Sequence, residues 1–148
     1  MEASGASTQR GRVLLVDDDR ALGGYLRRVL LAAGFEVAHE LDACTAMSRV
    51  QAEQWDLLMT DIELPGMSGL ELLERVREMA PALPVAVLTG HPSVDYAVSA
   101  LRCSAAEFLL KPVSADELVA TASKLIEAAS AARDRKPEKA RAHRDAPR

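Results

Sequence analysis

The sequence contains few cysteines, few histidines and few aromatic residues. Its two cysteines, Cys44 and Cys103, are far apart and have mostly small neighbours, so neither a disulfide nor a cysteine metal site is expected. The three histidines lie in three separate segments, which is not the spacing of zinc ligands. Because only 3% of the residues are aromatic, alanine, leucine and valine must supply most of the core.

Long hydrophobic runs are also absent. No uninterrupted apolar stretch approaches the roughly 20 residues that a membrane-spanning helix needs. Residues 1–11 are small and polar, without the apolar segment of a signal peptide, and we interpret them as a flexible leader. The sequence therefore predicts a cytoplasmic protein with no membrane partner.

Charge is unevenly distributed along the chain. The net charge is -4, but residues 133–148 hold seven basic and three acidic side chains, so this segment is +4 and residues 1–132 are -8. The basic segment contains proline and has no apolar periodicity, which predicts a disordered tail. No aromatic residues alternate with its charges, so DNA binding by this chain is not expected.

Residues 12–132 have the patterning of one α/β domain. Short apolar runs typical of strands alternate with amphipathic segments of helical period. Such alternation predicts a parallel sheet covered by helices on both faces, and the common five-stranded solution is the flavodoxin-like (βα)5 three-layer sandwich with strand order 2-1-3-4-5. We expect strands at 12–16, 35–39, 56–60, 83–89 and 106–110, and helices at 20–33, 43–53, 70–80, 93–101 and 115–132.

Residues with chemically useful side chains stand where four of these strands end. Asp17 and Asp18 follow the first strand, Asp61 follows the third, Thr89 ends the fourth and Lys111 follows the fifth. In open parallel sheets, ligands bind outside the carboxyl ends of the strands. The topology therefore predicts that these side chains share one site.

The chemistry of this set points to a phosphoryl group and a divalent cation. Three neighbouring carboxylates repel one another and require positive charge nearby. Mg²⁺ prefers oxygen ligands and commonly binds one or two carboxylates together with a phosphate oxygen. A lysine and a hydroxyl can stabilise the charge of a transferring phosphoryl group, and a carboxylate can be its acceptor.

Four motifs at this spacing resemble those of the receiver domain of two-component response regulators. The resemblance extends over roughly residues 12–129, which is nearly all of the domain. The motifs are Val16-Asp17-Asp18-Asp19, Thr60-Asp61 through Ser68-Gly69, Leu88-Thr89-Gly90, and Phe108-Leu109-Leu110-Lys111-Pro112.

The resemblance implies a phosphoacceptor and a metal site. Asp61 corresponds to the aspartate that accepts the phosphoryl group. Asp17 and Asp18 correspond to the acidic pair that holds Mg²⁺ together with Asp61. The backbone carbonyl of Glu63 corresponds to a further metal ligand.

The resemblance also implies a switch. Thr89 corresponds to the hydroxyl that moves toward the phosphoryl group, and Lys111 to the lysine that pairs with it. Phe108 occupies the aromatic switch position. The bond between Lys111 and Pro112 corresponds to a cis peptide, which is accessible mainly to X-Pro bonds.

By this resemblance the protein is a phosphorylation-dependent response regulator. A sensor histidine kinase or a phosphotransfer protein would donate the phosphoryl group, and phosphorylation would change binding to an output protein that the sequence does not identify. The surface of the fourth helix, fifth strand and fifth helix would carry this change and offers a place for two copies to pair. The protein would catalyse its own phosphorylation but no independent turnover, so it is not expected to be an enzyme.

Two other functions remain alternatives. One is a phosphate-independent protein-binding receiver module, against which the complete set of site residues argues. The other is a Mg²⁺-dependent phosphatase of the haloacid-dehalogenase type, which also forms an aspartyl phosphate. That family requires Thr or Val two residues after its second aspartate, and the run Asp17-Asp18-Asp19-Arg20-Ala21 lacks it. A flavodoxin is disfavoured because acids stand where it would bind a phosphate.

Overall fold

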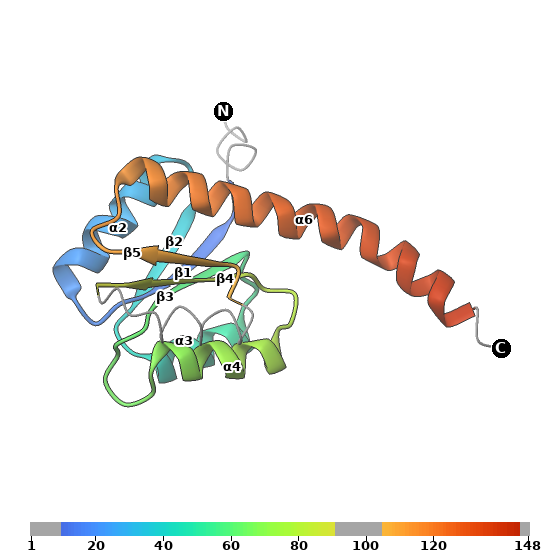
Figure 1. Ribbon diagram of the computed structural model, residues 1–148, viewed down its shortest axis with the longest axis horizontal. Helices are drawn as coiled ribbons and strands as arrows, with labels where there is room; N and C mark the ends of the chain where they lie inside the picture. Colours follow the sequence, from blue (N-terminus) through green and yellow to red (C-terminus); the bar gives the residue numbers. More distant parts are fainter. Residues whose placement is uncertain (1–9, 91–104, 146–148) are drawn as a thin grey trace.

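A computed structural model describes residues 10–90 and 105–145 of the chain and shows a five-stranded parallel sheet between two layers of helices (Figure 1). The sheet order is β2-β1-β3-β4-β5, which confirms the predicted fold class. The elements are β1 (Arg12–Val16), α2 (Arg20–Ala32), β2 (Glu36–Glu40), α3 (Ala43–Ala52), β3 (Leu57–Asp61), α4 (Gly69–Met79), β4 (Val85–Thr89), β5 (Glu107–Leu110) and α6 (Ala115–Asp145).

Strand β1 lies between β2 and β3 and pairs in parallel with both. Val13 pairs with Val37 of β2 on one side and with Leu57 of β3 on the other. Four residues of β1 and four of β3 are buried. Their continuous apolar character is typical of strands covered on both faces.

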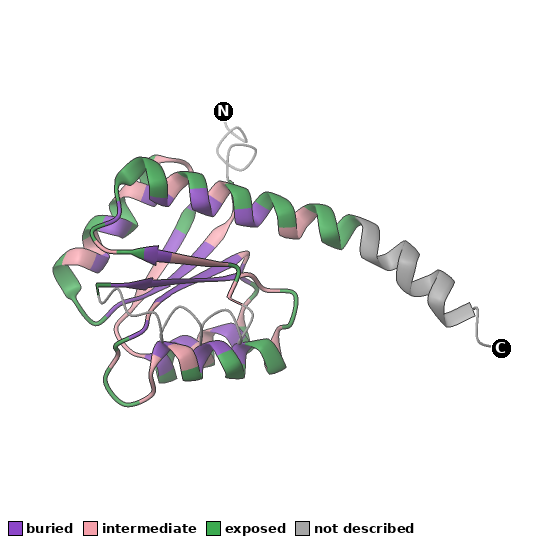
Figure 2. Ribbon diagram, in the orientation of Figure 1, coloured by how far each residue is buried: buried purple, intermediate pink, exposed green. Residues whose placement is uncertain are grey.

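The two faces of the sheet build two apolar clusters. Side chains alternate between the faces of a strand, so Val13 and Leu15 join the cluster under α2 and α6. Leu14 and Val16 join the cluster over α3 and α4. Figure 2 shows the resulting buried stripe on the sheet-facing side of each helix.

Three helices begin at the capping residues that the sequence provides. The side chains of Asp19, Asp42 and Ser68 each accept a hydrogen bond from a backbone N–H in the first turn of α2, α3 and α4. These caps fix where each loop after a strand ends. The predicted helix at 93–101, and with it part of the predicted switch surface, lies outside the described residues.

The end of the predicted leader is fixed to the domain, contrary to our expectation for residues 1–11. The backbone N–H of Arg10 donates to the Gly34 carbonyl over 3.0 Å, and the Gly11 carbonyl accepts from the Glu36 N–H over 2.9 Å. The Arg10 guanidinium also lies 4.9 Å from the centre of the Phe35 ring. The prediction was wrong here because composition does not show that these two residues extend the pairing of β1 with β2.

Helix α6 is longer than predicted. We expected it to end near Ala132 and residues 133–148 to be disordered, but it continues to Asp145 and projects beyond the sheet (Figure 1). The segment lacks the apolar residues that would pack against the sheet, and we therefore expected disorder. Its Ala, Lys, Arg and Glu residues nevertheless have high helix propensity, so the helix continues. Over the described residues, α6 included, no helix is both long and apolar enough to span a membrane.

Candidate functional site

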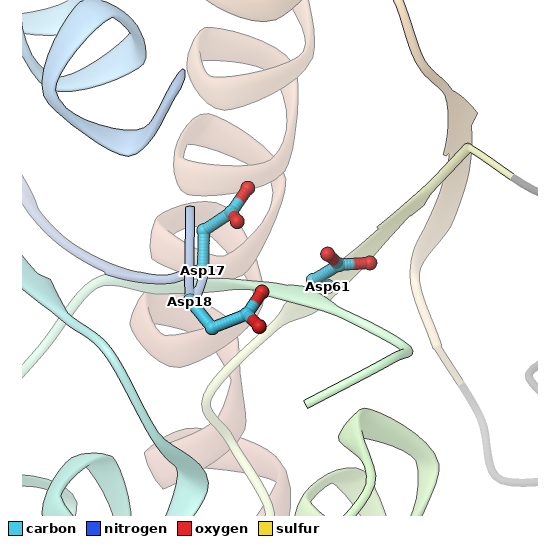
Figure 3. Close-up of side chains that lie close together, drawn as sticks. All are labelled: Asp17, Asp18 and Asp61. Carbon is cyan, nitrogen blue, oxygen red and sulfur yellow. The ribbon is translucent and has the colours of Figure 1, made fainter. Parts of the chain in front are cut away.

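Three carboxylates gather at the carboxyl edge of the sheet. Asp17 and Asp18 follow β1, and Asp61 is the last residue of β3. Each offers a carboxylate oxygen, and these oxygens all lie within 4.8 Å of one another. Figure 3 shows the three side chains grouped at this edge, as the strand order predicts.

Lys111 joins two of these carboxylates. Its Nζ atom lies 2.8 Å from Asp17 Oδ2 and 3.0 Å from Asp61 Oδ2. The side chains of Lys111, Asp17 and Asp61 are 15%, 3% and 12% exposed, so these ion pairs are largely shielded from water. Asp18 is exposed and leaves the group accessible from solvent.

Burial and charge act in opposite directions on Asp61. Burial raises the pKa of its carboxyl group, whereas the hydrogen bond and the positive charge of Lys111 lower it. The nearby Asp17 carboxylate raises it again, and the net result is a pKa above the ordinary aspartate value. The folded protein thus disfavours the charged form of Asp61.

Lys111 stays charged despite its burial. Burial lowers the pKa of its ammonium group, but the hydrogen bonds to Asp17 and Asp61 raise it more, so the net pKa lies above the ordinary lysine value. One ammonium group therefore faces three carboxylates. The site retains excess negative charge when all three are ionised.

The donor atoms of the site fit a hard divalent cation. Carboxylate oxygens are the ligands that Mg²⁺ prefers, and Mg²⁺ usually keeps several waters. An exposed carboxylate beside two shielded ones leaves room for such waters. Asp17, Asp18 and Asp61 are therefore the residues that would hold the ion.

The loop between β3 and α4 borders this site. The Glu63 N–H donates to Asp61 Oδ1 over 3.4 Å, at the long end for a hydrogen bond. The loop and Asp18 line a hollow of about 490 Å³. Glu63 is thus adjacent to the carboxylates, and its carbonyl as a metal ligand stays a prediction.

Thr89 and Phe108 lie on neighbouring strands beside the site. Thr89 is buried at the end of β4, and its carbonyl accepts from the Lys111 N–H over 2.8 Å. Phe108 is partly buried and packs against the cluster over α3 and α4. The switch roles of both side chains stay predictions.

The peptide bond between Lys111 and Pro112 is cis. The sequence predicted this bond from the resemblance. It lies directly after the lysine that joins the carboxylates.

One further residue at this edge, His39, was not predicted from the sequence. Its Nε2 atom lies 2.8 Å from the carbonyl oxygen of Asp17. The register of β1 and β2 pairs Leu15 with His39, so strand order alone places it near the end of β1. Nothing in the residue pattern shows that its ring turns toward the acidic loop.

Gly69 is expected to tolerate no side chain. A Cβ there would lie 1.9 Å from the Asp61 carbonyl oxygen, so Gly69→Ala must push the backbone of Asp61 away. We expect the free energy of unfolding to fall by about 1–3 kcal/mol, the usual cost of overpacking, in a urea titration. Gly90→Ala is the control, since a Cβ there meets no described atom within 4 Å. Equal stability of the two variants would contradict the close contact.

Comparison with known proteins gives one consistent family. The family profile of the response regulator receiver domain matches residues 13–123. Among solved structures, a CheY-like response regulator receiver domain protein from Methanospirillum hungatei JF-1 has a TM-score of 0.78 and 29% identity, covering 80% of this chain and 95% of that one. The beryllofluoride-activated NtrC4 receiver domain dimer has a TM-score of 0.77 and 30% identity, covering 80% and 98%.

A longer relative corrects one prediction. The DNA-binding transcriptional regulator NtrC of Escherichia coli K12 is 37% identical over 118 residues, which are 80% of this chain but 25% of that protein. The chain thus spans about a quarter of this relative. Our prediction that DNA binding is not expected of this chain is contradicted by this comparison, because the prediction weighed only the charges of this chain, whereas the relative, a DNA-binding transcriptional regulator, is much longer.

Proposed function

Because this chain belongs to the response regulator receiver family, we propose that it is a phosphorylation-dependent switch of a two-component system. Asp61 accepts the phosphoryl group, and a histidine kinase or phosphotransfer protein donates it. The observation that carries this proposal is the joining of Asp17 and Asp61 by Lys111 beside the exposed Asp18. It combines a nucleophile, a cation site and a fixed positive charge.

The transfer is a substitution at phosphorus. One carboxylate oxygen of Asp61 forms a bond to phosphorus while the bond from phosphorus to the donor atom breaks. The donor leaves with that electron pair, and Asp61 becomes an acyl phosphate. The side chain is 12% exposed, so the donor reaches it at the open edge of the sheet and not through the core.

Asp17, Asp18 and Asp61 hold the cation in this proposal, with the Glu63 carbonyl as a further ligand. When bound, Mg²⁺ supplies positive charge to a group whose carboxylates outnumber its ammonium, and so favours the approach of an anionic phosphoryl group. Lys111 contributes a second, permanent positive charge because its pKa is raised.

The response to phosphorylation begins at Lys111 and Thr89. A new phosphoryl group on Asp61 competes for the Lys111 ammonium that now joins Asp17 and Asp61. Lys111 follows β5 and its N–H bonds to the end of β4, so a change at the ammonium is passed to both strands. Thr89 and Phe108, one on each of these strands, are the switch residues of the proposal.

The output of the switch is control of transcription in this proposal. It is supported by the likeness to the receiver part of NtrC, a DNA-binding transcriptional regulator. The chain itself acts on no further substrate: its chemistry is limited to its own phosphorylation. The regulator as a whole, and not the acidic site, contacts DNA.

Phosphorylation by a small donor tests the proposal directly. With acetyl phosphate and Mg²⁺, the intact mass is expected to rise by one phosphoryl group, and removal of Mg²⁺ with EDTA should prevent this. Asp19→Asn is a matched control, since Asp19 lies beside the site but caps α2, and it should be labelled like the wild type. A protein that gains no mass, and whose spectra do not change with beryllofluoride, would be a phosphate-independent binding module.

A further inference from the structure

His39, near the end of β2, bonds to the main chain of Asp17. Its Nε2 atom lies 2.8 Å from the Asp17 carbonyl oxygen. A carbonyl oxygen only accepts hydrogen bonds, so Nε2 carries the proton and donates it. The Asp17 N–H in turn donates to the Glu40 carbonyl over 3.0 Å. The last two residues of β2 thus bind both polar backbone groups of Asp17.

The imidazole ring has space there because residue 23 is glycine. A Cβ at Gly23 would lie 2.1 Å from His39 Cε1 and 2.2 Å from Nε2, far inside any allowed contact. At the neighbouring Gly24, a Cβ would meet only Arg28 Nη1 at 3.7 Å. Both glycines weaken a helix alike, but only Gly23 is required by the ring.

The hydrogen bond from His39 fixes the direction of the backbone between Asp17 and Asp18. The Asp17 carbonyl belongs to the planar peptide group that leads into Asp18, so fixing the carbonyl also fixes the direction toward Asp18. Asp18 is exposed, and among the described residues no hydrogen bond is seen to hold its carboxylate. Its position near Asp17 and Asp61 therefore depends on the backbone.

We propose that His39 is a positioning residue of the metal site. Its bond to the Asp17 carbonyl holds the following peptide so that the Asp18 carboxylate joins those of Asp17 and Asp61. This inference rests on the proposed function, since it requires that the three carboxylates bind a divalent cation. Groups that orient metal ligands typically change metal affinity by about 10- to 100-fold.

Mn²⁺ binding to the full chain, followed by electron paramagnetic resonance, tests this role. We expect His39→Ala to weaken Mn²⁺ binding about tenfold. His39→Gln keeps an N–H that can donate to the carbonyl and should recover much of the affinity. At saturating Mg²⁺ the rate of phosphorylation by acetyl phosphate should return to the wild-type value, because Asp61 and Lys111 are unchanged.

Gly23 provides an independent route to the same effect. Gly23→Ala displaces the ring while leaving the histidine in place, so it should weaken Mn²⁺ binding as His39→Ala does. Gly24→Ala is the matched control and should bind Mn²⁺ normally. In a His39→Ala background the added methyl group has space, so Gly23→Ala should cause no further loss.

The outcomes separate the two proposals. Wild-type Mn²⁺ affinity in a folded His39→Ala protein overturns the role of His39, and so does a phosphorylation rate that stays low at saturating Mg²⁺. A wild-type protein that binds no Mn²⁺, or whose binding is unchanged by Asp61→Asn, overturns the proposed function and the role of His39 with it. Weaker Mn²⁺ binding in His39→Ala, Gly23→Ala and Asp61→Asn, with normal binding in Gly24→Ala, supports both.

Discussion

Replacing Asp61 with asparagine is expected to abolish phosphoryl labelling and, in the absence of Mg²⁺, to make the folded protein more stable. Labelling is lost because an amide cannot displace the donor at phosphorus. Stability rises because burial and the Asp17 carboxylate raise the pKa of Asp61, so folding works against its charge. Lys111 keeps its 2.8 Å bond to Asp17 and is not left unpaired.

We expect a gain on the order of 1 kcal/mol in the free energy of unfolding, measured by urea titration in EDTA. Because the pKa of Asp61 is raised in the folded protein, this gain in the free energy of unfolding depends on pH. A carboxyl group whose folded pKa is raised contributes stability below its unfolded pKa and loses it as the pH rises through the folded value. The advantage of Asp61→Asn should therefore shrink as the pH falls, and an advantage that grows instead would contradict the assignment.

The matched control is again Asp19→Asn, which removes one negative charge next to the site without entering it. Asparagine caps a helix as well as aspartate, so this variant should show neither the gain in stability nor the loss of labelling. Adding Mg²⁺ should stabilise the wild type more than Asp61→Asn. A phosphorylated Asp61→Asn protein would show that another residue is the acceptor.

Replacing Lys111 with methionine is expected to have the largest effect on stability. Methionine keeps the unbranched stem of the side chain without its ammonium group and leaves Asp17 and Asp61 facing each other without a cation, at 3% and 12% exposure. Removing one partner of a buried ion pair typically costs about 3–5 kcal/mol, a large share of the total stability of a domain. Urea titration in EDTA measures this cost.

Lys124 provides the control for this substitution. Its Nζ atom lies 3.1 Å from Glu107 Oε1, but its side chain is 65% exposed. Exposed ion pairs contribute about 0–1 kcal/mol, so Lys124→Met should be close to the wild type. Mg²⁺ should recover part of the loss in Lys111→Met and none in Lys124→Met. Similar costs for both substitutions would show that the bonds of Lys111 to the two carboxylates contribute little.

The sheet order and most of the site could be predicted from the sequence. The alternation of strands and helices determines the strand order, and the strand order determines which side chains meet where the strands end. Once five apolar runs alternate with helices, the order 2-1-3-4-5 follows from general rules of connection. That order brings Asp17 beside Asp61 through the pairing of β1 with β3. Lys111 follows β5, which is two strands from β3 and three from β1, and it reaches both carboxylates because its side chain is long.

Contacts that depend on the direction of one side chain could not be predicted in this way. His39 lies on a strand whose alternation says only which face it occupies. That its ring reaches the Asp17 carbonyl depends on the space above Gly23, which joins residues from three different elements. Arg10 is a similar case, since its guanidinium lies over Phe35 from outside the predicted domain.

The length of α6 could not be predicted from amino-acid composition. Charged segments without apolar residues are commonly disordered, and that rule predicted the tail. The same alanines, lysines and arginines have high helix propensity, and they follow a helix that Leu118, Ala122 and Ile126 already hold against the sheet. Extending an existing helix avoids the cost of starting one.

The place of Lys111 in the sequence also determines when the site is completed during synthesis. Lys111 follows Asp61 by 50 residues and Asp17 by 94 along the chain. A ribosome therefore releases all three aspartates well before the lysine that neutralises two of them. While the chain is still growing, solvent cations can supply the positive charge that Lys111 later provides to these carboxylates. We expect dissolved Mg²⁺ to assist β1 and β3 in pairing during synthesis, before the protein has anything to signal.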